Sequence, residues 1–247
     1  MLKLEKVSVF YGKREVVASV SAHLPSGSIT ALMGRNGIGK STLLSAVAGL
    51  LPYEGRVFWQ DTPLGTLKER EKSRMISYLP QLLRAPSVTV RELVGYGRTP
   101  HLAFPYCLGE EDKQTVEEAL RRVGLTELAL RDISTLSGGE LQRAYLAMAL
   151  AKQAPVLLLD EPFSHIDIAG IESLSSLLRT LAEEGKIILL SVHDPSLAVR
   201  LADHILLLQE KRECFFGTKE EALRKEVIEQ VLGVRRYKTE NGMLFFA

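Results

Sequence analysis

The sequence predicts an α/β fold in which a phosphate-binding loop follows a strand of a parallel sheet. Residues 34–41 read GRNGIGKS and fit the P-loop pattern G-x-x-x-x-G-K-[ST]. An apolar stretch of strand length, residues 28–33, precedes this loop, and a helical stretch starts at Ser41. Later in the chain come short apolar runs that are typical of strands buried on both faces, at residues 156–159, 187–192 and 205–208. These observations together indicate P-loop topology.

An antiparallel β region is expected before the loop. Residues 16–24 alternate in polarity, which predicts a half-buried strand, and residues 2–7 are expected to pair with it. The face that should be buried consists of Val16, Ala18, Val20, Ala22 and Leu24.

The middle of the chain, residues 88–152, reads as mostly helical and predicts an insertion into the α/β core. Val116, Leu120 and Val123 share one face of a helix whose neighbouring positions are charged. We therefore expect one domain, residues 1–247, with its core at about 1–85 and 153–247 and a helical subdomain at about 86–152. Further helices are expected at residues 171–182 and 220–232, and the aromatic ending at 244–246 should cover the core.

The net charge of the chain is too small to attract a nucleic acid or an anionic lipid surface through a strong electrostatic field. The chain has 247 residues with 31 Lys and Arg against 30 Asp and Glu, a net charge of +1, so we expect no nucleic-acid partner. Cys107 and Cys214 lie far apart, which favours a reduced, cytosolic protein. The first residues carry no apolar signal segment, and no apolar run approaches the roughly 18–20 residues that span a bilayer. Any action at a membrane would therefore need a partner.

The P-loop residues predict a nucleotide site. The glycines let backbone N–H groups face a bound anion, and the helix N-terminus that follows adds its dipole. Lys40 has the reach to contact β- and γ-phosphates, and the Ser41 hydroxyl is a ligand for Mg²⁺. A plain glycine turn is the alternative, and the flanking strand and helix disfavour it. The nucleotide contacts are expected from Asn36, Gly37, Gly39, Lys40, Ser41 and Thr42.

Two carboxylates follow the predicted strand at residues 156–159. Ligands bind at the carboxyl edge of a parallel sheet, so Asp160 is placed to hold Mg²⁺ through water and Glu161 to polarise an attacking water. An incidentally acidic strand end is the alternative. The preceding P-loop, together with Pro162 directly after the carboxylates, favours the functional interpretation.

Residues 136–140, LSGGE, begin a helix expected at 141–152. Ser137 and Glu140 form an S-x-x-E capping box, which needs no ligand. Gly138 and Gly139 are poor residues for a first helical turn but suit the close approach of a phosphate. Both roles remain open at this point.

With these motifs in this order, nearly the whole chain resembles the ATP-binding cassette (ABC) ATPases, which have a P-loop NTPase core. The resemblance implies that residues 34–41 are the Walker A loop, residues 156–160 the Walker B strand and residues 136–140 the signature, usually LSGGQ. Glu140 stands where the family usually has glutamine.

The same resemblance assigns roles to single residues. Gln81 would sense Mg²⁺ and the attacking water, Tyr11 would stack on adenine, and His193 would contact the γ-phosphate. Asp167 would belong to the D-loop, in which His165 departs from the common pattern. The implied catalytic set is thus Glu161, His193 and Gln81, and the implied Mg²⁺ contacts are Ser41, Gln81 and Asp160.

The family also implies partners. Two copies would enclose two ATP molecules, with Ser137, Gly138, Gly139, Glu140 and Asp167 of one copy facing the nucleotide held by the other. The dimer would lie on the cytoplasmic face of the cell membrane, bound to transmembrane permease subunits and served indirectly by an extracytoplasmic substrate-binding protein.

Residues 87–101 resemble the helical subdomain of ATPases that serve importers of ferric siderophores, haem and cobalamin, where TVRELV and GR-x-PH recur. Residues 89–101 lie in the helical insertion, where a permease should dock, so we expect them to govern coupling and expect Arg98→Ala to lower substrate-stimulated hydrolysis with ATP affinity intact. Importers of molybdate, zinc or manganese share parts of the pattern, and an ordinary Gly- and Pro-containing turn is the structural alternative.

Other classes of ATPase fit less well. A DNA-repair ATPase would separate the P-loop from the signature by a long coiled coil, whereas about a hundred residues without sustained heptads lie between Gly34 and Ser137. A small-molecule kinase would not need residues 137–140. A non-hydrolysing module would be expected to lack Glu161 or His193.

Overall fold

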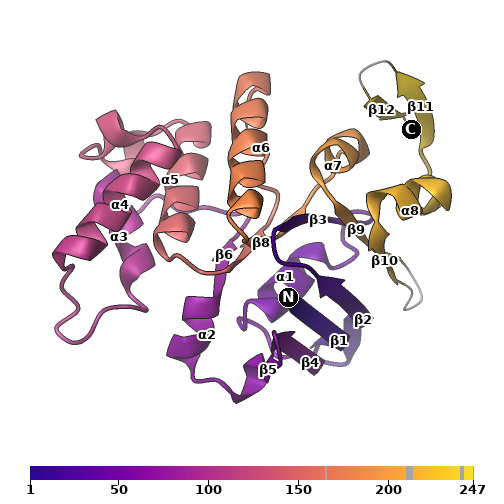
Figure 1. The fold of residues 1–247 in the computed structure, drawn as a ribbon, viewed down its shortest axis with the longest axis horizontal. Coiled ribbons are helices and arrows are strands. Elements are labelled where there is room, and N and C mark those ends of the chain that lie inside the picture. The colour runs from indigo at the N-terminus through magenta and orange to yellow at the C-terminus, as the bar shows by residue number, and fades with distance from the viewer. Residues whose placement is uncertain (165, 210–213, 240–241, 247) are drawn as a thin grey trace.

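A six-stranded sheet forms the centre of the computed structural model, which describes residues 1–164, 166–209, 214–239 and 242–246 (Figure 1). The strand order is β10-β9-β3-β8-β7-β6, in which only β10 runs antiparallel to its neighbour. The strands are β3 (Ser28–Met33), β6 (Ile76–Leu79), β7 (Val156–Leu159), β8 (Ile187–Ser191), β9 (His204–Leu208) and β10 (Cys214–Thr218). The predicted α/β class is confirmed, and each predicted apolar run is a strand.

A second, antiparallel sheet contains the pair of strands that was predicted before the P-loop, together with two strands that follow the loop. Its order is β2-β1-β4-β5, from β1 (Leu2–Tyr11), β2 (Arg14–Leu24), β4 (Glu54–Trp59) and β5 (Thr62–Pro63). The predicted buried face of β2 is only half right. Val20, Ala22 and Leu24 are buried, but before them Val17 is the buried residue, and Val16 and Ala18 are only partly covered.

A bulge in β2 explains this difference. Ser19 adopts a left-handed backbone with φ of 49°, and its N–H donates to the Ser8 hydroxyl at 2.8 Å. The pairing with β1 shifts there, because Val20 pairs with Val7 whereas Val17 pairs with Val9. An inserted residue reverses which side chains face the core, and polarity alone does not reveal it.

Helices gather on one side of the central sheet, where Figure 1 shows α3, α4 and α5 together and α6 beside α5. This part contains α3 (Val90–Gly95), α4 (Glu110–Arg122), α5 (Gly138–Ala151) and the short 3₁₀ turns η2 (Tyr96–Arg98), η3 (Thr126–Leu128) and η4 (Ile133–Thr135). Val116, Leu120 and Val123 are buried in it, as predicted. One apolar cluster continues from these residues to the sheet, so the subdomain limits at 86 and 152 stay a prediction.

The remaining helices flank the sheets. They are α1 (Lys40–Val47), η1 (Leu64–Thr66), α2 (Glu69–Met75), α6 (Ile168–Glu183) and α7 (Pro195–Leu201). Within the described residues, no helix has both the length and the apolar character that crossing a bilayer demands.

The C-terminal helix is divided in two. The sequence predicts one helix at 220–232, but α8 (Lys219–Arg224) and α9 (Val227–Leu232) are separated by Glu226, whose φ is 54°. A hairpin of β11 (Arg235–Thr239) and β12 (Gly242–Phe246) follows and packs on α7. Phe245 is buried there as expected, whereas Leu244 and Phe246 are exposed, because successive strand residues face opposite sides.

Two residues of the GR-x-PH segment, Gly97 and Arg98, are buried in the helical part, whereas Thr99 is exposed. A Cβ on Gly97 would lie 2.2 Å from the Met148 carbonyl oxygen, so only glycine allows this approach to α5. Arg98 is buried, and its Nη1 donates to the Ala151 carbonyl at 2.9 Å while its Nε donates to Asp112 at 2.8 Å. His101 Nε2 hydrogen-bonds the Lys152 carbonyl at 2.9 Å. Arg98 therefore holds the end of α5 against the start of α4, and the predicted role of this segment in coupling stays a prediction.

Replacing Arg98 by alanine should consequently destabilise the fold. Removing one partner of a buried ion pair leaves Asp112 without its cation and the Ala151 carbonyl without the Arg98 donor, so we expect a loss of about 3 kcal/mol in the free energy of unfolding, measured by urea denaturation. The control is Arg91→Ala, whose exposed pair with Glu117 should contribute less than about 1 kcal/mol. Equal stability of the two variants would contradict the structural role of Arg98.

Candidate active site

The carboxyl ends of four parallel strands open onto one cavity of about 350 Å³. The P-loop follows β3, and Gln81, Glu161 and His193 follow β6, β7 and β8. The cavity is lined by Val16, Asn36, Gly37, Gly39, Lys40, Ser41, Thr42, Gln81, Glu161 and His193. All of these except Val16 were predicted from the sequence as site residues, so the fold brings them together.

Glycine is required at the P-loop for both conformation and space. Gly39 has a φ of 110°, and a Cβ there would lie 2.8 Å from Val17 Cγ2. Gly39 is also the N-cap of α1, and it offers no side-chain hydrogen bond to the helix. The first N–H groups of α1 therefore keep their capacity for an anion, which is the arrangement that binds phosphate.

Lys40 is a buried cation at the base of the cavity. Its Nζ donates to the carbonyls of Gly34 at 2.9 Å and of Arg35 at 3.2 Å. An ammonium has three N–H donors, so it retains capacity for an anion beyond these carbonyls. Burial lowers the pKa of the Lys40 amine, and the nearby Glu161 and Asp160 carboxylates oppose that shift.

The Glu161 carboxylate is held by both residues that the sequence grouped with it as catalytic. Gln81 Nε2 donates to Glu161 Oε2 at 2.7 Å, and the ring Nε2 of His193 hydrogen-bonds Glu161 Oε1. The Ser164 hydroxyl adds a bond of 3.3 Å to Oε2. A carboxylate has about four lone-pair positions, so one remains to accept the proton of a water molecule.

The backbone at Glu161 is strained. Its φ of 51° is left-handed, a conformation that costs a non-glycine residue about 1–2 kcal/mol. Its N–H donates to the Ser191 hydroxyl at 2.7 Å, and the Ser164 N–H donates to its carbonyl at 3.1 Å. The same Ser191 hydroxyl donates to Asp160 Oδ1 at 2.7 Å, and Asp160 is itself buried.

Two residues of this site were not found from the sequence. Ser191 ends an apolar strand, and its position two residues before His193 was the available signal. Gln142 is a buried polar residue of α5 and lies four residues before Leu146, on the buried face of the helix. A polar side chain on such a face normally has a hydrogen-bond partner, and this position was the available signal.

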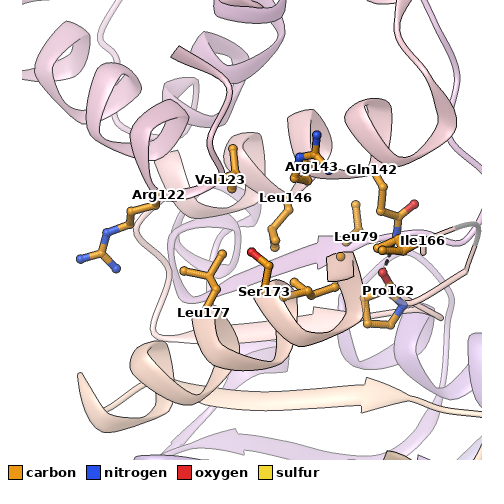
Figure 2. Close-up of a pocket in the computed structure, with 12 residues that line it drawn as sticks. Leu79, Arg122, Val123, Gln142, Arg143, Leu146, Pro162, Ile166, Ser173 and Leu177 are labelled. Atoms are coloured by element: carbon orange, nitrogen blue, oxygen red, sulfur yellow. Dashed lines mark hydrogen bonds between the residues drawn. The ribbon is translucent and has the colours of Figure 1, made fainter. Parts of the chain in front are cut away.

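Gln142 connects α5 to the turn that carries Glu161. Its Nε2 donates to the Pro162 carbonyl at 3.3 Å, at one end of a small cavity between α5 and α6 (Figure 2). Leu146, Val123 and Leu177 are among the apolar residues that line this mainly apolar cavity, and Arg122 and Arg143 also border it. The signature helix is thus joined directly to the residue after Glu161.

Residues 136–140, the predicted signature, do not line the cavity that contains Lys40 in their own chain. Ser137 accepts a hydrogen bond from the Glu140 N–H at 3.3 Å, and its own N–H donates to Glu140 Oε2 at 2.8 Å, which confirms the capping box. That backbone hydrogen bond lowers the pKa of the Glu140 carboxyl. Gly138 and Gly139 form the first turn of α5, three residues earlier than the predicted start.

Two further predicted contacts also lie outside this cavity. Tyr11 ends β1 with an exposed ring, and Asp167 is the N-cap of α6, accepting from the Gly170 N–H at 2.8 Å. His165 lies outside the described residues. Base stacking by Tyr11 and the D-loop role of Asp167 stay predictions.

The sequence is similar to those of ABC transporter ATP-binding proteins. The family model described as ABC transporter matches residues 17–164. The iron(3+)-hydroxamate import ATP-binding protein FhuC of Bacillus subtilis (strain 168) is 36% identical over 236 residues, which cover 94% of this chain and 88% of the relative. The hemin import ATP-binding protein HmuV of Pseudomonas putida is 38% identical over 241 residues, covering 95% and 93%.

Solved structures share the fold. The dimeric, post-hydrolysis structure of the ATP-binding cassette MJ0796 bound to ADP and Pi superposes with a TM-score of 0.77 at 28% identity. The match covers 89% of this chain and 99% of that chain.

Lys40→Ala should abolish nearly all ATP hydrolysis while the fold survives. The Lys40 ammonium would be the main side-chain charge on the β- and γ-phosphates, and the two carbonyls that it contacts, those of Gly34 and Arg35, belong to the loop and not to the core. Phosphate release and circular dichroism measure the two effects. Lys113→Ala, an exposed lysine of α4, is the control and should keep the normal rate. A Lys40→Ala variant as active as that control would refute the assignment of the loop.

Proposed function

The chain belongs to the ABC transporter family, and we propose that it is the ATP-hydrolysing motor subunit of an importer for iron–siderophore, haem or cobalamin complexes. One observation supports the hydrolysis most directly: the same cavity is lined by Lys40, Gln81, Glu161 and His193. The import of iron chelates or haem is supported by relatives whose names state import of iron(3+)-hydroxamate and of hemin.

Hydrolysis follows from the charges and donors of the cavity. The N–H groups at the start of α1 and the Lys40 ammonium would balance the phosphate charge. Glu161 would take a proton from the attacking water, while Gln81 and His193 hold its carboxylate in place. Tyr11 would stack on the base.

The oxygen ligands suit Mg²⁺. We assign the ion to the Ser41 hydroxyl, Asp160 and Gln81, because hard oxygen ligands on few side chains, completed by phosphate and water, are typical of Mg²⁺ in nucleotide enzymes. No group of three or more His, Cys, Asp or Glu side chains suited to a metal occurs in the described part of the chain, so an all-protein cage is not the basis of this site. When bound, the ion would neutralise charge on the phosphates.

A second copy would complete the site. Ser137, Gly138, Gly139, Glu140 and Asp167 lie outside the chain's own cavity, so in an ATP sandwich they would meet the nucleotide of the partner. The dimeric MJ0796 cassette supports such a homodimer. Permease subunits would hold the dimer at the cytoplasmic face of the membrane, and an extracytoplasmic binding protein would deliver cargo to them.

Glu161→Gln should bind ATP, lose hydrolysis and accumulate as a dimer. The amide keeps the size of the side chain but does not act as a base. Light scattering after size exclusion should show a dimer with ATP and a monomer without nucleotide. Glu172→Gln, on the exposed side of α6, is the control and should hydrolyse ATP normally. Normal turnover by Glu161→Gln would exclude it as the base.

The cargo is tested by growth. Cells that lack the protein should fail to use at least one of a ferric siderophore, haem or cobalamin as their single iron or cobalamin source. Wild-type protein should restore growth, whereas Lys40→Ala should not. Zinc, manganese and molybdate media are the controls, and a defect confined to these would refute the chelate assignment while leaving the ATPase intact.

A further inference from the structure

We propose that Ser191 is a positioning residue that ties Asp160 to Glu161, and that ATP hydrolysis depends on its hydroxyl. The inference rests on the proposed ATPase function and adds a residue of β8 to it. The proposal is based on the position of the buried Ser191 hydroxyl, which lies between Asp160, assigned to the metal, and Glu161, assigned to the attacking water.

The hydrogen bonds of Ser191 leave one orientation for its hydroxyl. The side chain is fully buried, and its Oγ lies 2.7 Å from both Asp160 Oδ1 and the Glu161 N. The Glu161 N–H can only donate, so the serine oxygen accepts from it. The single hydroxyl proton therefore points to Asp160, whose carboxylate accepts it.

The sheet places Ser191 at the meeting point of the site. β8 lies between β3 and β7, and Ser191 pairs with Leu32 of β3, next to the start of the P-loop. On its other side, Leu190 pairs with Leu159, so Ser191 comes level with Asp160. Two residues further on, His193 contacts the Glu161 carboxylate.

The strained turn needs this anchor. A left-handed backbone at a non-glycine residue persists only where its surroundings fix it. Gln81 and His193 hold the carboxylate of Glu161, but Ser191 holds its amide. Without the Ser191 hydroxyl, the Glu161 carboxylate would keep its contacts with Gln81 and His193. The Glu161 backbone, which orients that carboxylate, would lose the hydrogen bond of its N–H.

Serine is otherwise an unexpected residue at this position. The other residues of β8 are isoleucine and leucine, all fully buried. Alanine would fill nearly the same volume, leave the buried Glu161 N–H without its acceptor and remove one donor from the Asp160 carboxylate. Threonine would keep the hydroxyl.

The first test separates turnover from binding. Ser191→Ala should lower kcat roughly ten- to a hundredfold with little change in the KM for ATP, because the reacting groups shift while the P-loop is untouched. Ser191→Thr should recover most of the rate. The matched control is Ser77→Ala, a buried serine of β6 whose hydroxyl donates to the Ala149 carbonyl at 3.1 Å and touches neither carboxylate.

The second test needs no activity. Hydrogen–deuterium exchange in the nucleotide-free protein, followed in a peptide that covers residues 160–164, should be faster in Ser191→Ala than in wild type, Ser191→Thr or Ser77→Ala. Faster exchange together with a lower kcat and restoration by threonine supports the proposal.

Two results would overturn it. A kcat for Ser191→Ala equal to that of Ser77→Ala refutes the role in hydrolysis, and unchanged exchange at residues 160–164 refutes the tie itself. A wild-type protein that does not hydrolyse ATP would instead refute the proposed function, and the exchange data would still decide whether Ser191 holds the turn.

Discussion

Parallel strands end at the same edge of their sheet, and in this protein that geometry determines where the charged and polar groups of the candidate active site lie. β3, β6, β7 and β8 come from widely separated parts of the chain, yet a site residue follows each of them within three residues. The sheet brings the loops close together, and the residues of these loops provide the polar and charged groups of the site. Any change in strand order or register would move a carboxylate away from the buried Lys40 that it faces.

Within that frame, contacts from three directions converge on the turn at Glu161. β8 reaches its amide through Ser191, β6 leads to Gln81 at its carboxylate, and α5 contacts the next residue through Gln142. The helical part of the molecule and the central sheet therefore share one small structural element. A displacement of α5 relative to the sheet would act directly on the residue after Glu161.

The parts of this structure that are local in sequence were predictable, and those that depend on distant partners were not. The P-loop, the strands and the Ser137–Glu140 cap follow from short patterns, and the cavity followed from their order. The roles of Ser191 and Gln142 were not predicted, because their hydrogen-bond partners Asp160 and Pro162 are 31 and 20 residues away in the sequence. The residues next to them in the chain are mainly apolar and gave no further signal. The bulge at Ser19 and the break at Glu226 depend on single backbone angles that polarity does not encode.

The internal position of Arg98 bears on what the GR-x-PH pattern reports. Arg98 joins the start of α4 to the end of α5, and His101 contacts the residue after α5, so the helical part needs these side chains for its own stability. A pattern that the fold itself requires does not depend on the compound that is carried. The GR-x-PH pattern therefore records how this helical part is built.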